Sequence, residues 1–175
     1  MTESEFDFPW EYNFPPFFTI QKHAETRKQQ FLRWKELILA YAKHKNQAII
    51  NINDESELFH NNKINRTLDR ESREMILNEL CNSSNAARVN KNTGTYEIYW
   101  LTIEEWSNVI YTYALNSGMT NSVLTFFELL NGDDSKDQEF HQLNEQVFMK
   151  ALKHLETKGK CEIMEIDGSF GVKFF

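Results

Sequence analysis

The chain has little of what marks several large classes of protein. Its 175 residues include two cysteines, three prolines and six glycines. Cys81 and Cys161 form no C-x-x-C pair, which favours a reducing compartment without structural disulfides. The opening residues, MTESEFDF, lack the basic region of a signal peptide, and no apolar run approaches the roughly 20 residues that span a bilayer. The sequence therefore predicts a cytoplasmic, soluble protein.

Motifs for catalysis and for ligand binding are also missing. The five histidines are scattered, and none stands in H-E-x-x-H or near a cysteine at the spacing of zinc ligands. No glycine belongs to a phosphate-binding G-x-x-x-x-G-K-[ST] or G-x-G-x-x-G motif. Paired acids such as Glu104-Glu105 are interpreted as solvated charge at a helix start. We expect no enzymatic activity, no catalytic residue, no cofactor and no metal site.

A surplus of basic residues is absent as well. The formal net charge is -7, with 13 Lys and Arg against 14 Asp and Glu in residues 1–101, and 6 against 12 in residues 102–175. Binding to nucleic-acid phosphates needs an excess of positive charge. The balance indicates protein partners and no nucleic acid, and it makes the second half the more acidic one.

What the chain does have is an internal repeat. The pattern W-x-x-[LV]-I-x-x-Y occurs at residues 34–41 and again at 106–113, 72 positions apart. The same offset relates Met75, Ile76 and Leu80 to Val147, Phe148 and Leu152. Apolar residues at i, i+3, i+4 and i+7 share one face of a helix, as in helices that face a core. We infer two copies of one module of about 75 residues.

Each module is predicted to contain three helices and a β-hairpin. In the second, a capping box of Thr102 and Glu105 starts a helix to about residue 118, and a short strand or turn at 122–125 precedes a helix at 126–131. A helix at 144–158 and a hairpin turning at Asp167-Gly168 follow. In the first, helices are expected at 26–45, 58–67 and 69–81, with a hairpin of 86–90 and 95–100.

Three helices followed by a two-stranded wing are typical of a winged-helix domain. The sequence thus predicts a mainly helical α+β fold with two such domains in tandem, at residues 22–101 and 102–175. A tail of residues 1–21 precedes them. Since some winged-helix proteins read DNA with their third helix, a DNA-binding transcription factor is the alternative function. Lys150, Lys153, His154 and Lys158 make a small basic strip on the third helix of the second module, but Glu145 and Glu156 dilute it.

The tail holds all three prolines in the stretch FPWEYNFPPFFT, residues 8–19. Because proline fixes φ and lacks a backbone donor, we expect this stretch to be extended. Its aromatic side chains need cover, since burying each one is worth about 1.5 to 3 kcal/mol. Two surfaces could bury them. One is the chain's own first module, and the other is a groove on another protein, for which stiff proline-aromatic segments are well suited.

These residues resemble the small-subunit family of the ESCRT-II complex, the vacuolar protein-sorting protein 25 family. The resemblance covers essentially the whole chain. It is carried by residues 8–12 and 14–19 of the tail and by residues 26–30, 58–59 with 61–62, 105–106, 110–111, 139–141 and 171–175. The tail departs from a strict P-P-x-Y pattern, with Pro9-Trp10-Glu11-Tyr12 and Pro15-Pro16-Phe17-Phe18, so the pockets that receive Trp10 and Phe18 are expected to differ.

The resemblance implies a role. Family members are tandem winged-helix adaptors, two copies of which attach through the tail to the two larger ESCRT-II subunits. The residues implied in that contact are Pro9, Trp10, Tyr12, Phe14, Pro15, Pro16, Phe17 and Phe18. The second module would recruit the initiating ESCRT-III subunit during sorting of ubiquitinated cargo into multivesicular bodies. The protein would be recruited peripherally, and only indirectly, to endosomal membranes. The acidic charge of the second module suggests a basic helix as its ligand, although the basic strip leaves an acidic partner open.

Overall fold

The structure is a computed structural model that describes residues 4–175. The chain forms two compact units that divide between Trp100 and Leu101. The boundary expected from the sequence followed residue 101. The first three residues of the expected tail, 1–21, lie outside the described residues.

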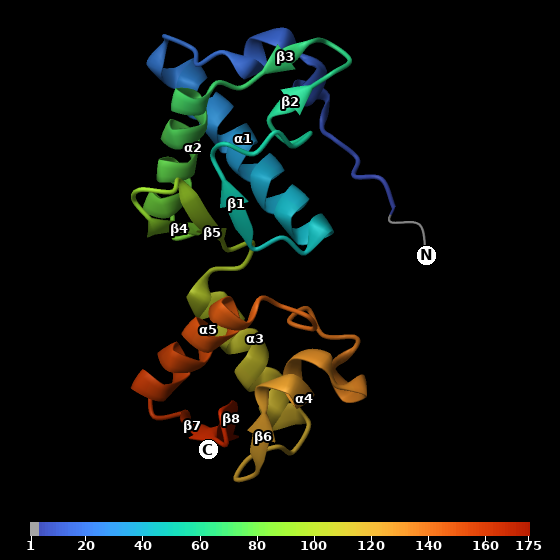
Figure 1. Cartoon of the computed structure of the whole chain (residues 1–175), viewed down its shortest axis with the longest axis vertical. Coiled ribbons are helices and arrows are strands. Elements are labelled where there is room, and N and C mark those ends of the chain that lie inside the picture. The colour runs from blue at the N-terminus through green and yellow to red at the C-terminus, as the bar shows by residue number, and fades with distance from the viewer. Residues whose placement is uncertain (1–3) are drawn as a thin grey trace. The chain divides into compact units, whose positions relative to one another are not determined.

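Unit 1 consists of the proline-aromatic segment, two long helices and short strands (Figure 1). Its elements are η1 (Trp10–Asn13), η2 (Pro15–Phe18), α1 (Ala24–Lys45), β1 (Ile49–Asn51), β2 (His60–Asn61), β3 (Arg66–Thr67), α2 (Arg70–Asn82), β4 (Ala86–Asn90) and β5 (Thr95–Ile98). The four residues of the W-x-x-L-I-x-x-Y pattern on α1 are all buried, as the helical periodicity predicted. They form the centre of the unit's core.

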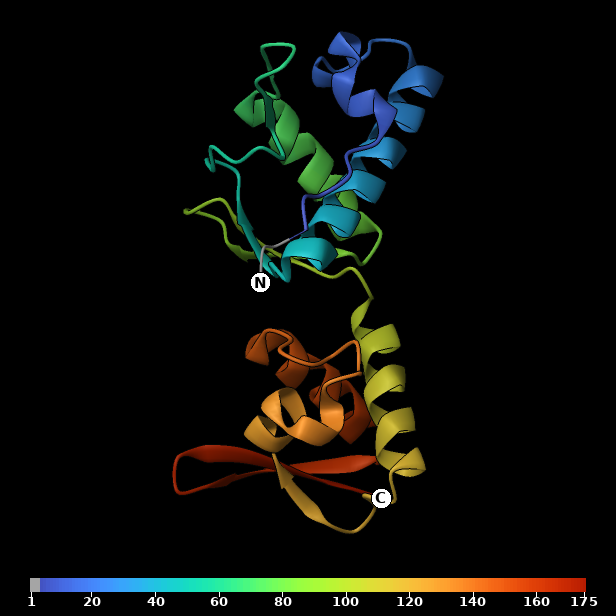
Figure 2. The same cartoon turned by 90° about the vertical axis from the view of Figure 1, so that its right-hand side faces the viewer.

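Unit 2 places its helices on one side of a three-stranded sheet (Figure 2). Its elements are α3 (Ile103–Asn116), β6 (Val123–Thr125), α4 (Phe126–Asn131), η3 (Asp133–Ser135), α5 (Glu145–Thr157), β7 (Cys161–Ile166) and β8 (Ser169–Phe174). The predicted capping box is present: Thr102 Oγ1 accepts from Glu105 N at 3.2 Å, and Glu105 Oε2 accepts from Thr102 N at 2.8 Å. The hairpin turns at Asp167 and Gly168, both with positive φ, as predicted.

The two units share one sheet topology, which fits the inferred repeat. The strand order is β1-β5-β4 in unit 1 and β6-β8-β7 in unit 2, so a strand after the first helix joins each hairpin. The predicted wing of unit 1 therefore gains a third strand that sequence analysis missed, while the short strand before α4 is confirmed. Together these elements confirm the tandem winged-helix, α+β fold. Burial differs most at one repeat position, where Met75 is exposed and its counterpart Val147 is buried; Val109 and Tyr113 are partly buried, whereas Leu37 and Tyr41 are buried.

The helix expected at residues 58–67 is wrong. The segment instead makes the small antiparallel pair β2–β3, in which His60 pairs with Thr67. The reason is local turn chemistry. Asn61 Oδ1 accepts a hydrogen bond from Lys63 N at 2.9 Å, and Asn65 takes a left-handed φ of 51°, a conformation that asparagine tolerates. These asparagines favour a turn over helix continuation.

The extended conformation expected for residues 8–19 is also wrong, because the segment folds into two single 3-10 turns. Phe17 N donates to Phe14 O at 2.9 Å, and Tyr12 N donates to Pro9 O at 3.0 Å. Pro15 occupies the first position of η2, where a missing donor costs nothing and a fixed φ suits the turn. Proline excludes a helix interior, but a single turn has no interior.

Candidate functional site

The proline-aromatic segment has an inward and an outward side. Tyr12, Phe17 and Phe18 are at most 7% exposed and belong to the core of unit 1. Trp10 is 71% exposed and Phe14 is 49% exposed. The three prolines, Pro9, Pro15 and Pro16, are exposed as well. The chain's own first module therefore covers part of the segment, and the rest of it faces solvent.

Trp34 on α1 receives the inward side. The rings of Phe17 and Trp34 stack with centroids 4.4 Å apart and an interplanar angle of 1°, and Phe18 meets the same indole edge-on at 5.5 Å. Trp34 Nε1 donates to Phe17 O at 2.9 Å, which satisfies the buried indole donor. Aromatic pairs of this kind add about 0.5 to 1.5 kcal/mol beyond area burial.

Buried amide side chains hold the backbone of the segment. Gln30 Nε2 donates to Phe17 O at 2.9 Å and to Thr19 O at 2.8 Å. Asn61 Nδ2 donates to Tyr12 O at 2.6 Å. Both amides are nearly fully buried, so each of these hydrogen bonds would be costly to lose. The segment thus has one defined conformation, fixed from α1 on one side and from β2 on the other.

A tyrosine cluster extends this attachment. The Tyr12 hydroxyl donates to the backbone oxygens of Glu57 and His60, and the Tyr41 hydroxyl donates to Glu57 Oε1 at 3.3 Å. Burial, and secondarily the charge of Glu57, raises the pKa of Tyr12 to about 12. Burial first, and then the charge and hydrogen bond of Glu57 and the proximity of Tyr12, raise the pKa of Tyr41 to about 12. Both hydroxyls therefore stay protonated at neutral pH and serve as donors.

The outward side borders a groove of about 520 Å³ between the segment and α1. Trp10, Phe14 and Pro16 form one wall. Gln29 and Arg33 of α1 contribute to the other. Such a volume is in the range of ligand-binding clefts in proteins. The rings of Trp10 and Phe14 lie 5.8 Å apart, so they present one apolar surface.

The charge beside this groove is balanced. Arg33 Nη1 lies 2.9 Å from Glu36 Oε2, and Arg33 Nε lies 3.5 Å from Glu11 Oε1. The exposed pair of Arg33 with Glu36 is worth little to stability, which leaves Arg33 available to exchange this partner on binding. We name the surface of Trp10, Phe14, Pro16, Gln29 and Arg33 the Trp10 surface.

The sequence pattern indicates the residues of the segment but not those that position them. Trp34 was assigned to the core, which is confirmed, yet its contact with Phe17 was not foreseen. No functional motif in the sequence includes the amide residues Gln29, Gln30 and Asn61. They do stand among the motifs that carry the family resemblance, and that signal could have found them.

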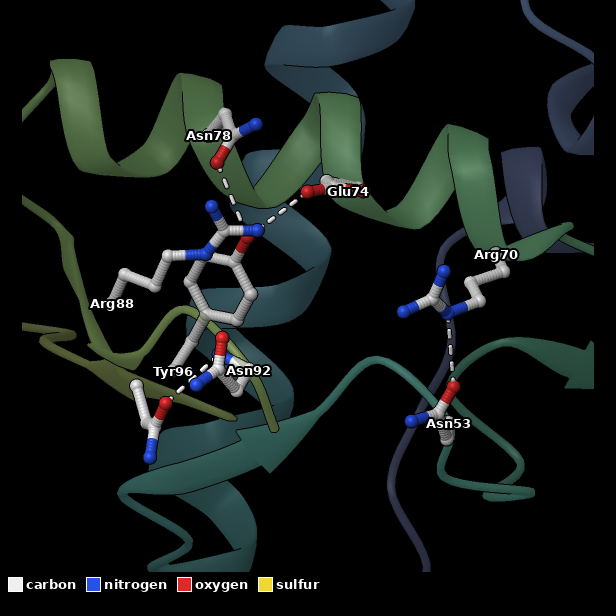
Figure 3. Close-up of polar contacts among 8 residues, drawn as sticks. Asn53, Arg70, Glu74, Asn78, Arg88, Asn92 and Tyr96 are labelled. Carbon is white, nitrogen blue, oxygen red and sulfur yellow. Dashed lines mark hydrogen bonds and ion pairs between the residues drawn. The ribbon is translucent and has the colours of Figure 1, made fainter. Parts of the chain in front are cut away.

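The helix and hairpin that would meet DNA in a winged-helix reader are occupied with internal contacts in unit 1 (Figure 3). Arg88 pairs with Glu74, and its guanidinium lies over the Tyr96 ring at 5.5 Å. Arg70 Nε donates to Asn53 Oδ1 at 3.1 Å. These cations are neutralised or fixed within the chain, so this face gives the DNA-binding alternative no support.

Unit 2 offers a different surface. Phe127 on α4 is 72% exposed, while its neighbour Phe126 points into the core. Val123 on β6 is half exposed nearby in the sequence. The acids of residues 133–139 are exposed in the connection between α4 and α5. On the basic strip of α5, Lys158 Nζ lies 3.8 Å from Glu104 Oε1.

Two further features of the described residues bear on other functions. Within residues 4–175, no three His, Cys, Asp or Glu side chains gather in a way that could hold a metal ion. Among the helices of the same residues, none combines the length and apolarity that crossing a membrane requires.

Comparison with known proteins relates the chain to one family over nearly its whole length. A model of the family described as ESCRT-II complex subunit matches residues 11–144. The chain is 43% identical over 173 residues to vacuolar protein-sorting-associated protein 25 of Drosophila melanogaster, covering 98% of this chain and 99% of that protein. It is 40% identical over 172 residues to the protein of the same name from Homo sapiens, covering 97% and 98%.

Solved structures agree with these sequence relatives. A crystal structure of subunit VPS25 of the endosomal trafficking complex ESCRT-II matches with a TM-score of 0.83 and 26% identity, over 94% of this chain and 97% of that chain. A chain in the crystal structure of the endosomal complex ESCRT-II (VPS22/VPS25/VPS36) matches with a TM-score of 0.84 and 26% identity, over 95% and 98%.

Proposed function

The chain belongs to the family of ESCRT-II complex subunits, and from this premise we propose that it is a non-enzymatic structural adaptor that docks on the two larger subunits of its complex through the Trp10 surface. Those subunits would be the counterparts of VPS22 and VPS36, which accompany VPS25 in a solved complex. The observation that carries the proposal is the fixed, outward position of Trp10 and Phe14 on a segment whose other side is buried.

The energetics favour docking at this surface. Burying Trp10 and Phe14 against a partner would contribute about 1.5 to 3 kcal/mol each. Large aromatic side chains near the centre of an interface commonly supply most of the binding energy. Because Gln30 and Asn61 already order the segment, binding does not have to fix a flexible tail, and that lowers its entropic cost.

The eight residues inferred from the sequence then divide by role. Five exposed residues make the direct contact with the larger subunits: Pro9, Trp10, Phe14, Pro15 and Pro16. Three buried residues hold the contact surface in place: Tyr12, Phe17 and Phe18. Two copies of the chain per complex, one on each larger subunit, would follow from the family resemblance.

Co-expression with the two larger subunits tests this proposal. The complex is isolated on a size column and its mass is measured by light scattering, for the wild type and for Trp10→Ala/Phe14→Ala. These two side chains are exposed, so their truncation removes the contact without opening the core. We expect the wild type to give a complex with two copies of this chain, and the variant to elute separately while keeping the unfolding transition of the wild type.

The matched control is Val123→Ala/Phe127→Ala, which removes two exposed apolar side chains from unit 2. This variant should assemble with the larger subunits like the wild type. If Trp10→Ala/Phe14→Ala assembled equally well, a different surface would make the contact and the proposal would be wrong.

For unit 2, we propose that it recruits the initiating ESCRT-III subunit, at endosomes, during sorting of ubiquitinated cargo into multivesicular bodies. Its 12 acids against 6 bases favour a basic helix as the ligand, and the exposed Phe127 supplies an apolar anchor for that helix. Membrane contact of this chain would be indirect, through its partners.

A binding titration of the purified ESCRT-III subunit against this chain tests the second proposal. We expect the affinity to fall about tenfold from low to high salt, because screening weakens charge complementarity. Phe127→Ala should weaken binding further, whereas Trp10→Ala should leave it unchanged. Binding that ignores both salt and Phe127 would show that neither feature carries the interaction.

A further inference from the structure

A second groove in unit 1 borders α1 next to the Trp10 surface, and Gln29 lies between the two. It has a volume of about 440 Å³ and lies between the N-terminal half of α1 and the C-terminal end of α2, two helices that pack against each other. Its lining is Ala24, Arg27, Lys28, Gln29, Phe31, Leu32, Lys35, Glu79 and Ser83.

The periodicity of α1 separates the two grooves. Residues 26, 30 and 33 lie on the side of the proline-aromatic segment, residues 24, 28, 31 and 35 line the second groove, and Gln29 borders both. At 3.6 residues per turn these two sets point in nearly opposite directions. A partner seated on the Trp10 surface would reach the shared Gln29 at the border but would leave Lys28, Phe31 and Lys35 accessible.

The floor of the groove is apolar. Phe31 is half-buried and packs on the core of unit 1, and Leu32 beside it is 44% exposed. Contact with another apolar side chain would bury the exposed leucine. Such burial contributes about 25 cal/mol of free energy per Å² of apolar surface removed from water.

The rim is basic in a chain that is acidic overall. Arg27, Lys28 and Lys35 face a single acid, Glu79, whereas the whole chain has a net charge of -7. Within residues 4–175, Lys28 and Lys35 make no ion pair, and Arg27 makes only a 3.5 Å contact from Nη1 to Lys22 O. The cations of this rim are thus available to carboxylates from outside.

We propose that this groove binds an acidic helical segment of a partner protein. Lys28 and Lys35 lie two turns apart on one face, a rise of about 10.5 Å. A helix laid along α1 would meet them with acids at positions i and i+7, and would place apolar residues at i+3 and i+4 on Phe31 and Leu32. The ligand is therefore an acidic amphipathic helix with a narrow apolar stripe.

The shape favours a peptide over a lipid surface. A membrane is met by protruding apolar and basic side chains, whereas this site is hollow and bordered by Glu79. A helix inserts into such a groove in a common mode of peptide recognition. The site is independent of the docking proposed for the Trp10 surface, so the two can fail separately.

The test uses the full chain and three synthetic helical peptides. The first carries acids at i and i+7 with Leu at i+3 and i+4, the second replaces the acids with Lys, and the third replaces the leucines with Ala. Fluorescence anisotropy gives the affinities, and amide shifts of the isotope-labelled chain locate the binding. We expect only the first peptide to bind well, with shifts concentrated in residues 24–35 and 79–83.

Charge reversal provides the decisive variants. Lys28→Glu/Lys35→Glu should weaken binding of the first peptide by about tenfold or more, since two attractive contacts become repulsive. Lys63→Glu/Arg66→Glu makes the same change of charge at the β2–β3 turn of the same unit, and should leave the affinity unchanged.

Three outcomes would overturn the proposal. The first is no binding of the acidic peptide at concentrations up to about 1 mM, the weak limit of specific recognition. The second is binding that survives the reversal of Lys28 and Lys35 or maps to other residues. The third is Lys28- and Lys35-dependent sedimentation with vesicles of phosphatidylcholine and phosphatidylserine in the absence of peptide binding, which would assign the groove to anionic lipid.

Discussion

The two units build the same three-stranded sheet but close their cores with different parts of the chain. In unit 1 the cover comes from before the first helix, through Phe17 and Phe18 packed on Trp34. In unit 2 the cover comes from the connection between α4 and α5, which buries Phe140 and Leu143. The repeat thus extends to helices and strands, and the segment that completes each core is free to differ.

This difference has a functional consequence. The cover of unit 1 buries one side and presents Trp10 and Phe14 on the other, so a single segment serves both stability and contact with partners. The cover of unit 2 presents exposed acids at residues 133–139. Equivalent domains therefore offer an apolar surface in one unit and a charged surface in the other.

The largest effect is expected from removing the covering aromatic of each unit. Phe17→Ala should lower the free energy of unfolding of unit 1 by about 3 to 5 kcal/mol, because it deletes a ring stacked on Trp34 and leaves a cavity. Phe140→Ala should do the same to unit 2. Hydrogen exchange in denaturant, read separately for the amides of each unit, measures both. If either substitution lowered the free energy of unfolding equally in both units, the two units would not be closed by separate segments.

A smaller effect is expected where the cover of unit 2 begins. A Cβ on Gly132 would stand 2.2 Å from Glu128 O, a backbone atom that cannot move away alone. Gly132→Ala should therefore destabilise unit 2 by about 1 to 3 kcal/mol through overpacking and leave unit 1 unaffected. Gly118→Ala is the control for the clash, since a Cβ there meets nothing within 4 Å, although its positive φ adds some strain. Chemical denaturation of both variants compares them.

The two units should lose stability at different alkaline pH values. The pKa of Tyr12 and that of Tyr41 are raised from 10.0 to about 12, so the folded state favours the neutral phenols. Their contribution to the stability of unit 1 is complete below pH 10 and is lost as the pH rises towards 12. In unit 2, burial raises the pKa of Cys161 from 9.0 to about 11, and the corresponding loss runs from pH 9 to 11.

Tyrosinate absorbance and hydrogen exchange, followed from pH 8 to 12, show which unit loses stability first. The experiment uses a Cys81→Ser background, because burial also raises the pKa of the Cys81 thiol. We expect unit 2 to weaken first, and Tyr41→Phe to reduce the alkaline loss in unit 1. Tyr12 and Tyr41 ionising near pH 10 in the folded chain would refute the assignment.

The smallest effects concern the first helix of each unit. Helix α3 begins with a capping box, whereas α1 begins at His23 without a side-chain cap to the backbone. Thr102→Ala should cost unit 2 about 1 kcal/mol, and His23→Asp should stabilise unit 1 by about 0.5 kcal/mol. Thermal melts of each variant against the wild type test the pair. A gain from Thr102→Ala would mean that the box is not what starts α3.

Local signals in the sequence determined much of this protein. The capping box at Thr102, the turn at Asp167-Gly168 and the buried stripe of α1 each depend on residues within a few positions of one another, so pattern alone predicts them. The signals were also enough to infer the repeat, the winged-helix fold and the family.

The tertiary structure alone decided the conformation and the two sides of the proline-aromatic segment. Prolines permit both an extended chain and a single 3-10 turn. The choice is made by Trp34, Gln30 and Asn61, which hydrogen-bond to carbonyls of the segment 11 to 49 residues away in sequence. Contacts over such separations leave no periodic pattern, so which aromatics face the core and which face a partner became visible only in the folded chain.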